Sequence, residues 1–159
     1  ANQKDLDALL RAAEVACAGN GARLTQRRRQ VLSELIKSSS SLSAYEVLDL
    51  CNRSTTSTMP AMSVYRILDF LEQQLLVHRL STSNKYVSCA HIACDHKHFQ
   101  ATHFLLCEGC SSVEEVDATQ EASDALEQMA ETVGFKLTTQ QFELSGICTT
   151  CQNSAGRGL

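Results

Sequence analysis

The sequence lacks any apolar run approaching the roughly 20 residues that a membrane-spanning helix needs. Its first residues, ANQKDLDALLRAAEV, carry charges throughout and lack the uninterrupted apolar segment of a signal peptide. These absences argue against a membrane or exported protein, and we expect a cytoplasmic one. Thiols stay reduced in that compartment, so the eight cysteines indicate metal ligation or redox sensing before structural disulfides.

The chain also lacks an overall positive charge, which is unusual for a protein that binds nucleic acid. Its formal net charge is −4, but this total hides an asymmetry. Residues 1–89 hold 11 Lys and Arg against 8 Asp and Glu, whereas residues 90–159 hold 3 against 10. The asymmetry predicts two modules with different partners, at 1–89 and 90–159.

The first module has the element order of a winged helix-turn-helix domain. Thr25 can cap the second helix, and Ser43 with Glu46 forms a capping box before the third. The only proline, Pro60, closes a polar loop before the fourth, and two β-prone runs, LLVHRL and KYVSC, then predict a hairpin. The expected helices cover residues 6–15, 26–36, 44–51 and 61–74.

The second module shows strand patterns around one helix, so we expect a small α/β domain and an α+β fold overall. HFLLC and SVEEV predict strands on either side of a Cys-Glu-Gly-Cys turn, and FKLTTQQFEL predicts one or two more. The helix between them, from about 118 to 133, has an apolar face that we expect to be buried. That face consists of Ala122, Leu126, Met129 and Val133.

Two Cys-x-x-Cys pairs give the strongest motif, Cys107 with Cys110 and Cys148 with Cys151. Two thiolates three residues apart on a tight turn can occupy two corners of a tetrahedral Zn²⁺ site, and two such turns complete it. A redox pair is the alternative, but such motifs usually begin a helix in a βαβ context that is absent here. We predict a closed structural zinc site that stabilises the fold.

The stretch CAHIACDHKHFQATHFLLCEGC holds four of the eight cysteines and four of the five histidines. Once the Cys-x-x-Cys pair is assigned, more candidate ligands remain than one site can use. These are Cys89, His91, Cys94, His96, His98 and His103, with His78 upstream. A site that includes the Cys89 thiolate favours zinc, because Fe²⁺ and Mn²⁺ sites would use nitrogen and oxygen without sulfur.

The outer face of the fourth helix has the side chains expected of a DNA-binding surface. Arg66 can donate two hydrogen bonds to guanine, while Ser63, Tyr65 and Tyr45 can contact phosphates or thymine methyl groups. The arginine triplet at 27–29, with Arg27 and Arg28 foremost, can bind the DNA backbone, although such a triplet is often only a solvated helix start.

Over nearly its whole length the chain resembles the ferric uptake regulator family, and most closely its zinc uptake regulator branch. The resemblance rests on ARLTQRRRQVL, SAYEVLDL, SVYRILDFLEQQLLVHRL and the two Cys-x-x-Cys pairs. It implies a homodimeric repressor with a winged-helix domain and an α/β dimerisation domain, which binds AT-rich palindromic double-stranded operators when zinc is bound. It implies no membrane partner and no small-molecule substrate.

The resemblance also implies a regulatory zinc, in addition to the structural one, in each protomer. The matching ligands are His78, Cys89, one of His96 and His98, and Glu115, with His98 preferred and His103 as an outside candidate. The loop before Cys107 is longer than in the family, which leaves the histidine open. The Asp-His-Lys-His run replaces the His-His-Asp-His run of iron sensors, which argues against a second histidine-rich site. In the fourth helix, Ser63 replaces the usual threonine and keeps its hydroxyl group.

Three other functions fit parts of the pattern. An iron or peroxide sensor of the same family would have a sulfur-free regulatory site. A thiol redox switch would form reversible disulfides. A zinc hydrolase would need an open coordination position and a general base, and ligands placed beside a DNA-binding module argue against an enzyme.

Overall fold

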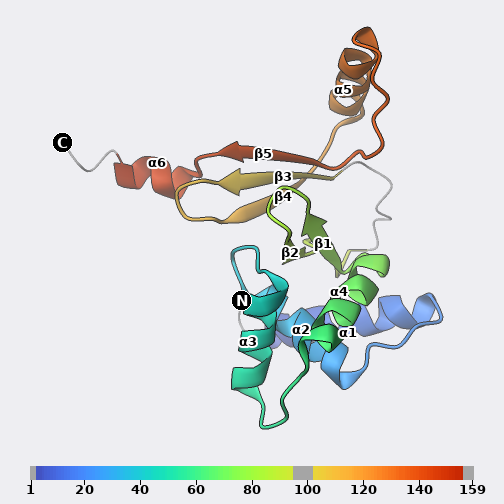
Figure 1. The fold of residues 1–159 in the computed structure, drawn as a ribbon, viewed down its shortest axis with the longest axis vertical. Coiled ribbons are helices and arrows are strands. Elements are labelled where there is room, and N and C mark those ends of the chain that lie inside the picture. The colour runs from blue at the N-terminus through green and yellow to red at the C-terminus, as the bar shows by residue number, and fades with distance from the viewer. Residues whose placement is uncertain (1–2, 95–101, 156–159) are drawn as a thin grey trace. The chain divides into compact units, whose positions relative to one another are not determined.

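The chain folds as two compact units, Ala1–Asp95 and His96–Leu159. A computed structural model describes residues 3–94 and 102–155, and its elements are labelled in Figure 1. His96 and His98, two of the predicted ligands, lie outside the described residues. No helix in 3–94 or 102–155 is long and apolar enough to span a membrane.

The first unit consists of four helices followed by a hairpin, as the sequence predicts. Thr25 caps α2 by accepting a hydrogen bond from the backbone N–H of Arg28, and the predicted capping box of Ser43 and Glu46 is present at the start of α3. The elements are α1 (Gln3–Gly19), α2 (Gln26–Lys37), α3 (Ala44–Ser54), α4 (Ala61–Gln73), β1 (Val77–Leu80) and β2 (Lys85–Ser88).

One continuous apolar core holds these helices together. It includes the buried faces of α2, α3 and α4, and the thiols of Cys17 and Cys51 are buried within it. Val15 is exposed on α1, and the thiol of Cys94 is also exposed. Helical spacing places Val15 beyond the buried edge of α1, and its side chain is 73% exposed.

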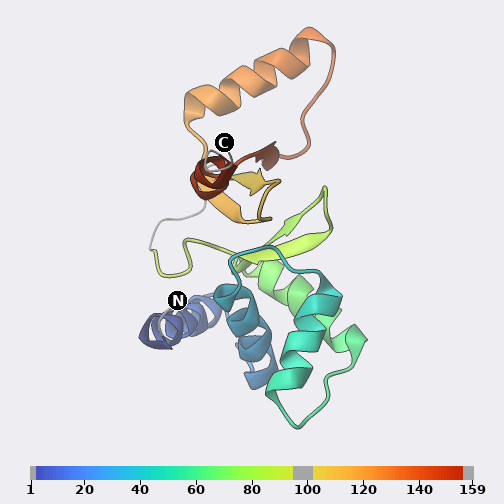
Figure 2. The ribbon, with the colours of Figure 1, turned by 90° about the vertical axis from the view of Figure 1, so that its left-hand side faces the viewer.

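The hairpin is the wing of this unit, and it is joined to the chain before α3. Asn84, at a φ of 54°, makes the turn, and its side-chain oxygen accepts two hydrogen bonds from Arg79 at 3.0 and 2.6 Å. Leu42 and Tyr86 exchange two backbone hydrogen bonds of 2.9 and 2.7 Å. The wing therefore lies across one end of the helices, as Figure 2 shows.

The second unit is built on a three-stranded sheet with the order β4-β3-β5. The central strand pairs antiparallel with β4, which follows it through a tight turn, and parallel with β5, which the chain reaches only after a helix. The elements are β3 (Thr102–Cys107), β4 (Val113–Asp117), α5 (Gln120–Thr132), β5 (Phe142–Gly146) and α6 (Thr149–Ala155). The segment FKLTTQQFEL therefore supplies one strand.

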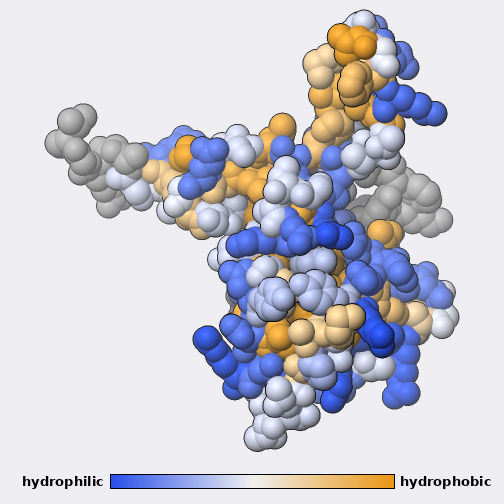
Figure 3. Space-filling view, in the orientation of Figure 1, coloured by the Kyte–Doolittle hydropathy of each residue, from blue (hydrophilic) through white to orange (hydrophobic). Residues whose placement is uncertain are grey.

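The apolar face of α5 is not buried, contrary to the sequence-based expectation. Met129 is 62% exposed and Val133, just beyond the helix, is 73% exposed; Ala130 is the buried residue of α5. Figure 3 shows apolar side chains gathered along this helix. Periodicity identifies residues that share a face, but it does not show whether anything within the same chain covers that face.

Candidate metal centre and nucleic-acid interface

The four predicted cysteines of the structural site meet in the second unit. Cys107 ends β3 and Cys110 lies in the following turn, while Cys148 immediately precedes α6 and Cys151 lies on it. Their four Sγ atoms all lie within 4.8 Å of one another. Parallel pairing of Cys107 with Gly146 brings the end of β5 beside the end of β3, so the second pair reaches the first.

The thiols of this cluster have pKa values shifted in opposite directions. The backbone N–H of Cys148 donates a hydrogen bond to Sγ of Cys107 at 3.2 Å and helps to lower the Cys107 pKa to about 6. Hydrogen bonding with Ser112 lowers the pKa of Cys110, whereas the neighbouring sulfur atoms raise the pKa of Cys151 to about 12. All four sulfur atoms would be thiolates only with a compensating cation beside them, and a divalent metal ion would provide that charge.

The turn of the first pair requires a glycine at position 109. A Cβ atom there would lie 2.9 Å from Sγ and 3.1 Å from Cβ of Cys151, both closer than normal packing allows. The Cys-Glu-Gly-Cys sequence therefore leaves room for the second cysteine pair. This role of Gly109 does not follow from the sequence alone, where its one signal is a place between two spaced cysteines.

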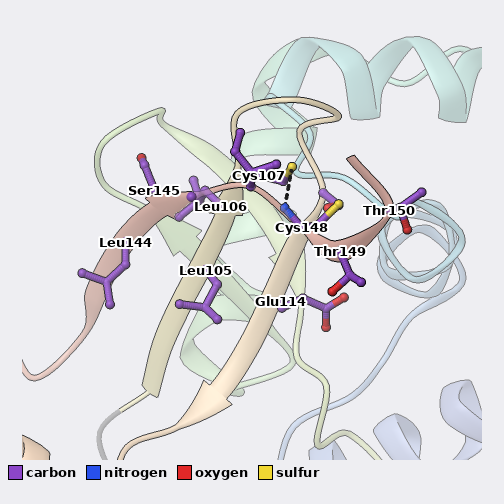
Figure 4. Close-up of a pocket in the computed structure, with 12 residues that line it drawn as sticks. Leu105, Leu106, Cys107, Glu114, Leu144, Ser145, Cys148, Thr149 and Thr150 are labelled. Carbon is purple, nitrogen blue, oxygen red and sulfur yellow. Dashed lines mark hydrogen bonds between the residues drawn. The ribbon is translucent and has the colours of Figure 1, made fainter. Parts of the chain in front are cut away.

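A pocket with a volume of about 480 Å³ lies beside the cysteine cluster, on one face of the sheet. Figure 4 shows Leu105 and Leu144 side by side on β3 and β5, with Glu114 and Thr149 nearby. The lining is largely aliphatic, with one carboxylate. With four sulfur ligands on a tetrahedral ion, the site would have no open position for a substrate.

Two of the predicted regulatory ligands lie together in the wing. His78 is on β1 and is half-buried, Cys89 follows β2 and is buried, and their ligand atoms lie within 4.8 Å. Cys89 is held by its N–H, which donates to the Leu76 carbonyl at 2.9 Å, and its Sγ accepts from the His91 N–H at 3.3 Å. The wing thus holds one sulfur and one imidazole close together, and hydrogen bonds fix the position of the sulfur.

The other predicted ligands belong to the second unit. Glu115 lies on β4 and is half-buried. His103 lies on β3 and is only 8% exposed, with its ring edge-on to Phe142 at a centroid distance of 5.2 Å. Its Nε2 atom has no hydrogen-bond partner among the described residues. His103 therefore belongs to the sheet and not to a surface loop.

The outer faces of α3 and α4 carry the predicted DNA-binding side chains. Tyr45 is 66% exposed, and its ring meets Tyr65 edge-on, with centroids 6.4 Å apart and planes at 88°. Arg66 is exposed and Ser63 half-buried on the same helix. The opposite face of α4 packs into the core through Val64, Ile67, Leu68 and Leu71. The helix thus separates an apolar face from a polar and aromatic one.

The three arginines at the start of α2 have different environments. The Arg28 guanidinium lies 3.5 Å from the centre of the Phe70 ring, and it donates to the Arg23 carbonyl at 2.7 Å. Arg29 forms an ion pair with Glu14. Arg27 is exposed, and it lines a surface groove between α2 and the loop before α4.

A winged-helix unit with an exposed aromatic and basic face, followed by an α/β unit with a four-cysteine cluster, defines a two-domain DNA-binding metalloprotein. The family model described as "Ferric uptake regulator family" matches residues 19–145. The zinc uptake regulation protein of Escherichia coli (strain K12) is 34% identical over 146 residues, which cover 90% of this chain and 81% of that protein. The chain therefore belongs to the ferric uptake regulator family.

Solved structures and a further relative agree with this assignment. A zinc uptake regulator complexed with zinc and DNA is similar with a TM-score of 0.80 and 30% identity, covering 95% of this chain and 97% of that one. The holo form of XcZur has a TM-score of 0.73 and 33% identity, with coverages of 91% and 96%. The ferric uptake regulation protein of Helicobacter pylori (strain ATCC 700392 / 26695) is 26% identical over 94% of this chain and 95% of that protein.

Proposed function

We propose that this protein is a zinc-responsive transcriptional repressor, which binds operator DNA as a homodimer and controls zinc uptake genes. The observation that carries the proposal is the position of Cys89 beside His78 in the wing, with ligand atoms within 4.8 Å. A buried thiolate next to an imidazole favours zinc over iron or manganese. Because both donors belong to the DNA-binding unit, metal binding can affect how that unit engages DNA.

The regulatory site, in this proposal, takes ligands from both units. His78 and Cys89 come from the wing, Glu115 comes from β4, and one of His96 and His98 completes the set, with His98 preferred. Each protomer holds a second, structural zinc between the two Cys-x-x-Cys pairs. Zinc as the metal is supported by the relatives named for zinc uptake regulation and by the sulfur ligand in each site.

DNA recognition, in this proposal, uses the outer face of α4. Arg66 contacts a base edge, Tyr45 and Tyr65 add apolar and hydroxyl contacts, and Ser63 lies at the same end of the helix. Arg27 contacts the DNA backbone, whereas Arg28 supports α2 through Phe70. Two copies of α4 in a dimer would bind successive major-groove half-sites, which suits an AT-rich palindromic operator.

Regulation follows from ligands that are divided between two units of one chain. In this proposal, the site is complete only when the units adopt one relative orientation. That orientation is also the one in which the two copies of α4 in the dimer match the operator half-sites. Bound zinc supplies the free energy that favours this arrangement. Moving a two-state equilibrium from 1:99 to 99:1 requires a preference of about 5.5 kcal/mol, which a few coordinate bonds can provide.

The same reasoning favours a cytoplasmic regulator over an enzyme. The matching family and relatives are regulators, and the cysteine cluster would leave a bound metal no open position for a substrate. An iron or peroxide sensor remains the alternative function within the family, and it differs in not requiring a thiolate at position 89.

The experiment that tests the proposal is operator binding at buffered free zinc concentrations, with zinc counted per protomer. We expect Cys89→Ser to keep the dimer and the structural zinc while losing zinc-dependent affinity. Cys94→Ser is the matched control, because Cys94 is exposed in the same segment, and it should behave as the wild type. Unchanged zinc dependence in Cys89→Ser, or an equal response to Fe²⁺, would contradict the proposal.

A further inference from the structure

Met62 is a large apolar side chain that the fold leaves outside the core. It lies in the first turn of α4 and is 65% exposed, although the same helix buries four aliphatic residues on its opposite face. Tyr65 and Arg66 follow it at i+3 and i+4, so the three side chains share one face. Met62 therefore belongs to the proposed DNA-binding face and lies nearest to the N-terminus of α4.

This position is the part of a recognition helix that commonly contacts base edges. A thioether offers only a weak acceptor and no donor, so the contacts open to Met62 are apolar. The apolar group on the major-groove edge of a base pair is the C5 methyl of thymine. A flexible and polarisable side chain adapts well to such a small apolar partner.

Two aromatic side chains lie on the same surface as Met62, and in the proposed function they make DNA contacts of their own. The Tyr45 ring packs edge-on against Tyr65, and Tyr65 is 37% exposed. Pro60 precedes α4 and makes no side-chain capping bond. Arg66 provides the hydrogen-bonding group of the same face, and Met62, which is 65% exposed, is its most accessible aliphatic side chain.

We infer that Met62 contacts a thymine methyl group in each operator half-site and so contributes to sequence specificity. The inference rests on the proposed function, because it assumes that α4 lies in the major groove of the operator. It adds a thymine-specific apolar contact to the guanine-specific contact available to Arg66. It also explains why an apolar side chain stays exposed where a charged one would be better solvated.

The test compares thymine with deoxyuridine, which lacks only the methyl group. The probe is the duplex that the zinc-loaded, full-length protein selects from a random-sequence library, with each thymine of one half-site replaced in turn. For the wild type, we expect one of these replacements to weaken binding about fourfold, because burial of one methyl group contributes about that factor to affinity. For Met62→Ala, the same replacement should change affinity by less than about 1.5-fold, because the partner of the methyl group is already gone.

Two further variants control this comparison. Met62→Leu keeps an aliphatic side chain of similar size and should retain most of the fourfold effect. Val15→Ala removes an exposed apolar side chain from α1 and should match the wild type at every position. Circular dichroism would verify helix content, which alanine at an exposed helical position should preserve.

The possible outcomes separate this inference from the proposed function. If Met62→Ala keeps the same deoxyuridine penalties as the wild type, Met62 makes no methyl contact and the inference is wrong. If the zinc-loaded protein selects no duplex at all, the proposed function itself fails. If Met62→Ala, but not Val15→Ala, loses the deoxyuridine penalty at one thymine, the result supports both the proposed function and the Met62 contact.

Discussion

The backbone N–H of Cys148 donates a hydrogen bond to Sγ of Cys107 at 3.2 Å, and this bond joins the two cysteine pairs of the second unit. The donor belongs to the main chain and the acceptor is a side-chain sulfur, so the bond links the backbone at the second pair to a ligand atom of the first. It also favours the thiolate of Cys107, the form that binds a metal ion.

Removing one sulfur from this cluster should therefore cost both the metal and the fold of the second unit. We expect Cys148→Ser to lose the structural zinc and to unfold the second unit, because metal and folding free energies of about 10 kcal/mol are coupled in closed zinc sites. Zinc release and thermal unfolding measure the two effects. Cys94→Ser, with an exposed thiol outside the cluster, should retain zinc and melt as the wild type does; equal zinc contents in both variants would contradict a four-cysteine site.

Glycine at position 109 should be needed for zinc retention. Gly109→Ala would bring a Cβ to 2.9 Å from Sγ of Cys151, so the pair must separate. We expect faster zinc loss to a chelator, followed with a chromogenic zinc indicator. Gly146→Ala is the matched control, because a Cβ there has no neighbour within 4 Å. Identical release rates for the two variants would show that the turn adjusts without moving the ligand.

The arginines of α2 should separate DNA affinity from stability. Arg27→Ala should weaken binding to all sequences and reduce the slope of log affinity against log salt by about 1 per protomer. Arg28→Ala should instead lower the free energy of unfolding by about 1 kcal/mol, because it removes the contact with Phe70. Anisotropy titrations in salt and urea unfolding measure the two effects, and each variant serves as the control for the other.

The capping box of α3 should contribute measurably to the first unit. Ser43→Ala removes the acceptor for the Glu46 N–H, which lies 3.2 Å from the serine hydroxyl, and should cost about 1 kcal/mol in urea unfolding. Ser39→Ala, at an exposed position outside the helices, should change the free energy of unfolding little. If Ser43→Ala lowers the free energy of unfolding by less than a few tenths of a kcal/mol, the pairing of Leu42 with Tyr86 of the wing already fixes the start of α3.

Burial of Cys51 should make stability depend on alkaline pH. Burial raises the pKa of this thiol from 9.0 to about 11, so the unfolded chain releases its proton first as pH rises. The associated stability is complete below pH 9 and is lost by about pH 11, a change of at most about 2 to 3 kcal/mol. Urea unfolding across this range should show a steeper decline in the wild type than in Cys51→Ala; parallel curves would mean that the thiol stays neutral in both states.

Local chemistry was sufficient to predict most of the first unit. The cap at Thr25, the capping box of Ser43 and the stripe of α4 depend on neighbours within one or two helical turns, and the structure confirms them. The two cysteine pairs were equally local, because their spacing alone identifies each half of the cluster.

Other features depend on partners that are distant in sequence. The contact of Arg28 with Phe70 depends on how α2 packs against α4, which the sequence does not show, and a DNA contact by Arg28 stays a prediction. The exposure of Met129 depends on what covers α5, which no pattern within that helix reveals. The parallel pairing of β3 with β5 likewise follows from the crossover through α5 and not from either strand alone.

The bridge between Leu42 and Tyr86 makes the wing and the start of α3 a single mechanical element. Lys85 of the wing also lies 3.6 Å from Glu46 of α3, so a main-chain and a charged link act at the same place. A displacement of the hairpin at His78 or Cys89 would then move the start of α3 with it. In the proposed function, a metal held at the hairpin would therefore act on the whole winged-helix unit, because the hairpin and α3 move together.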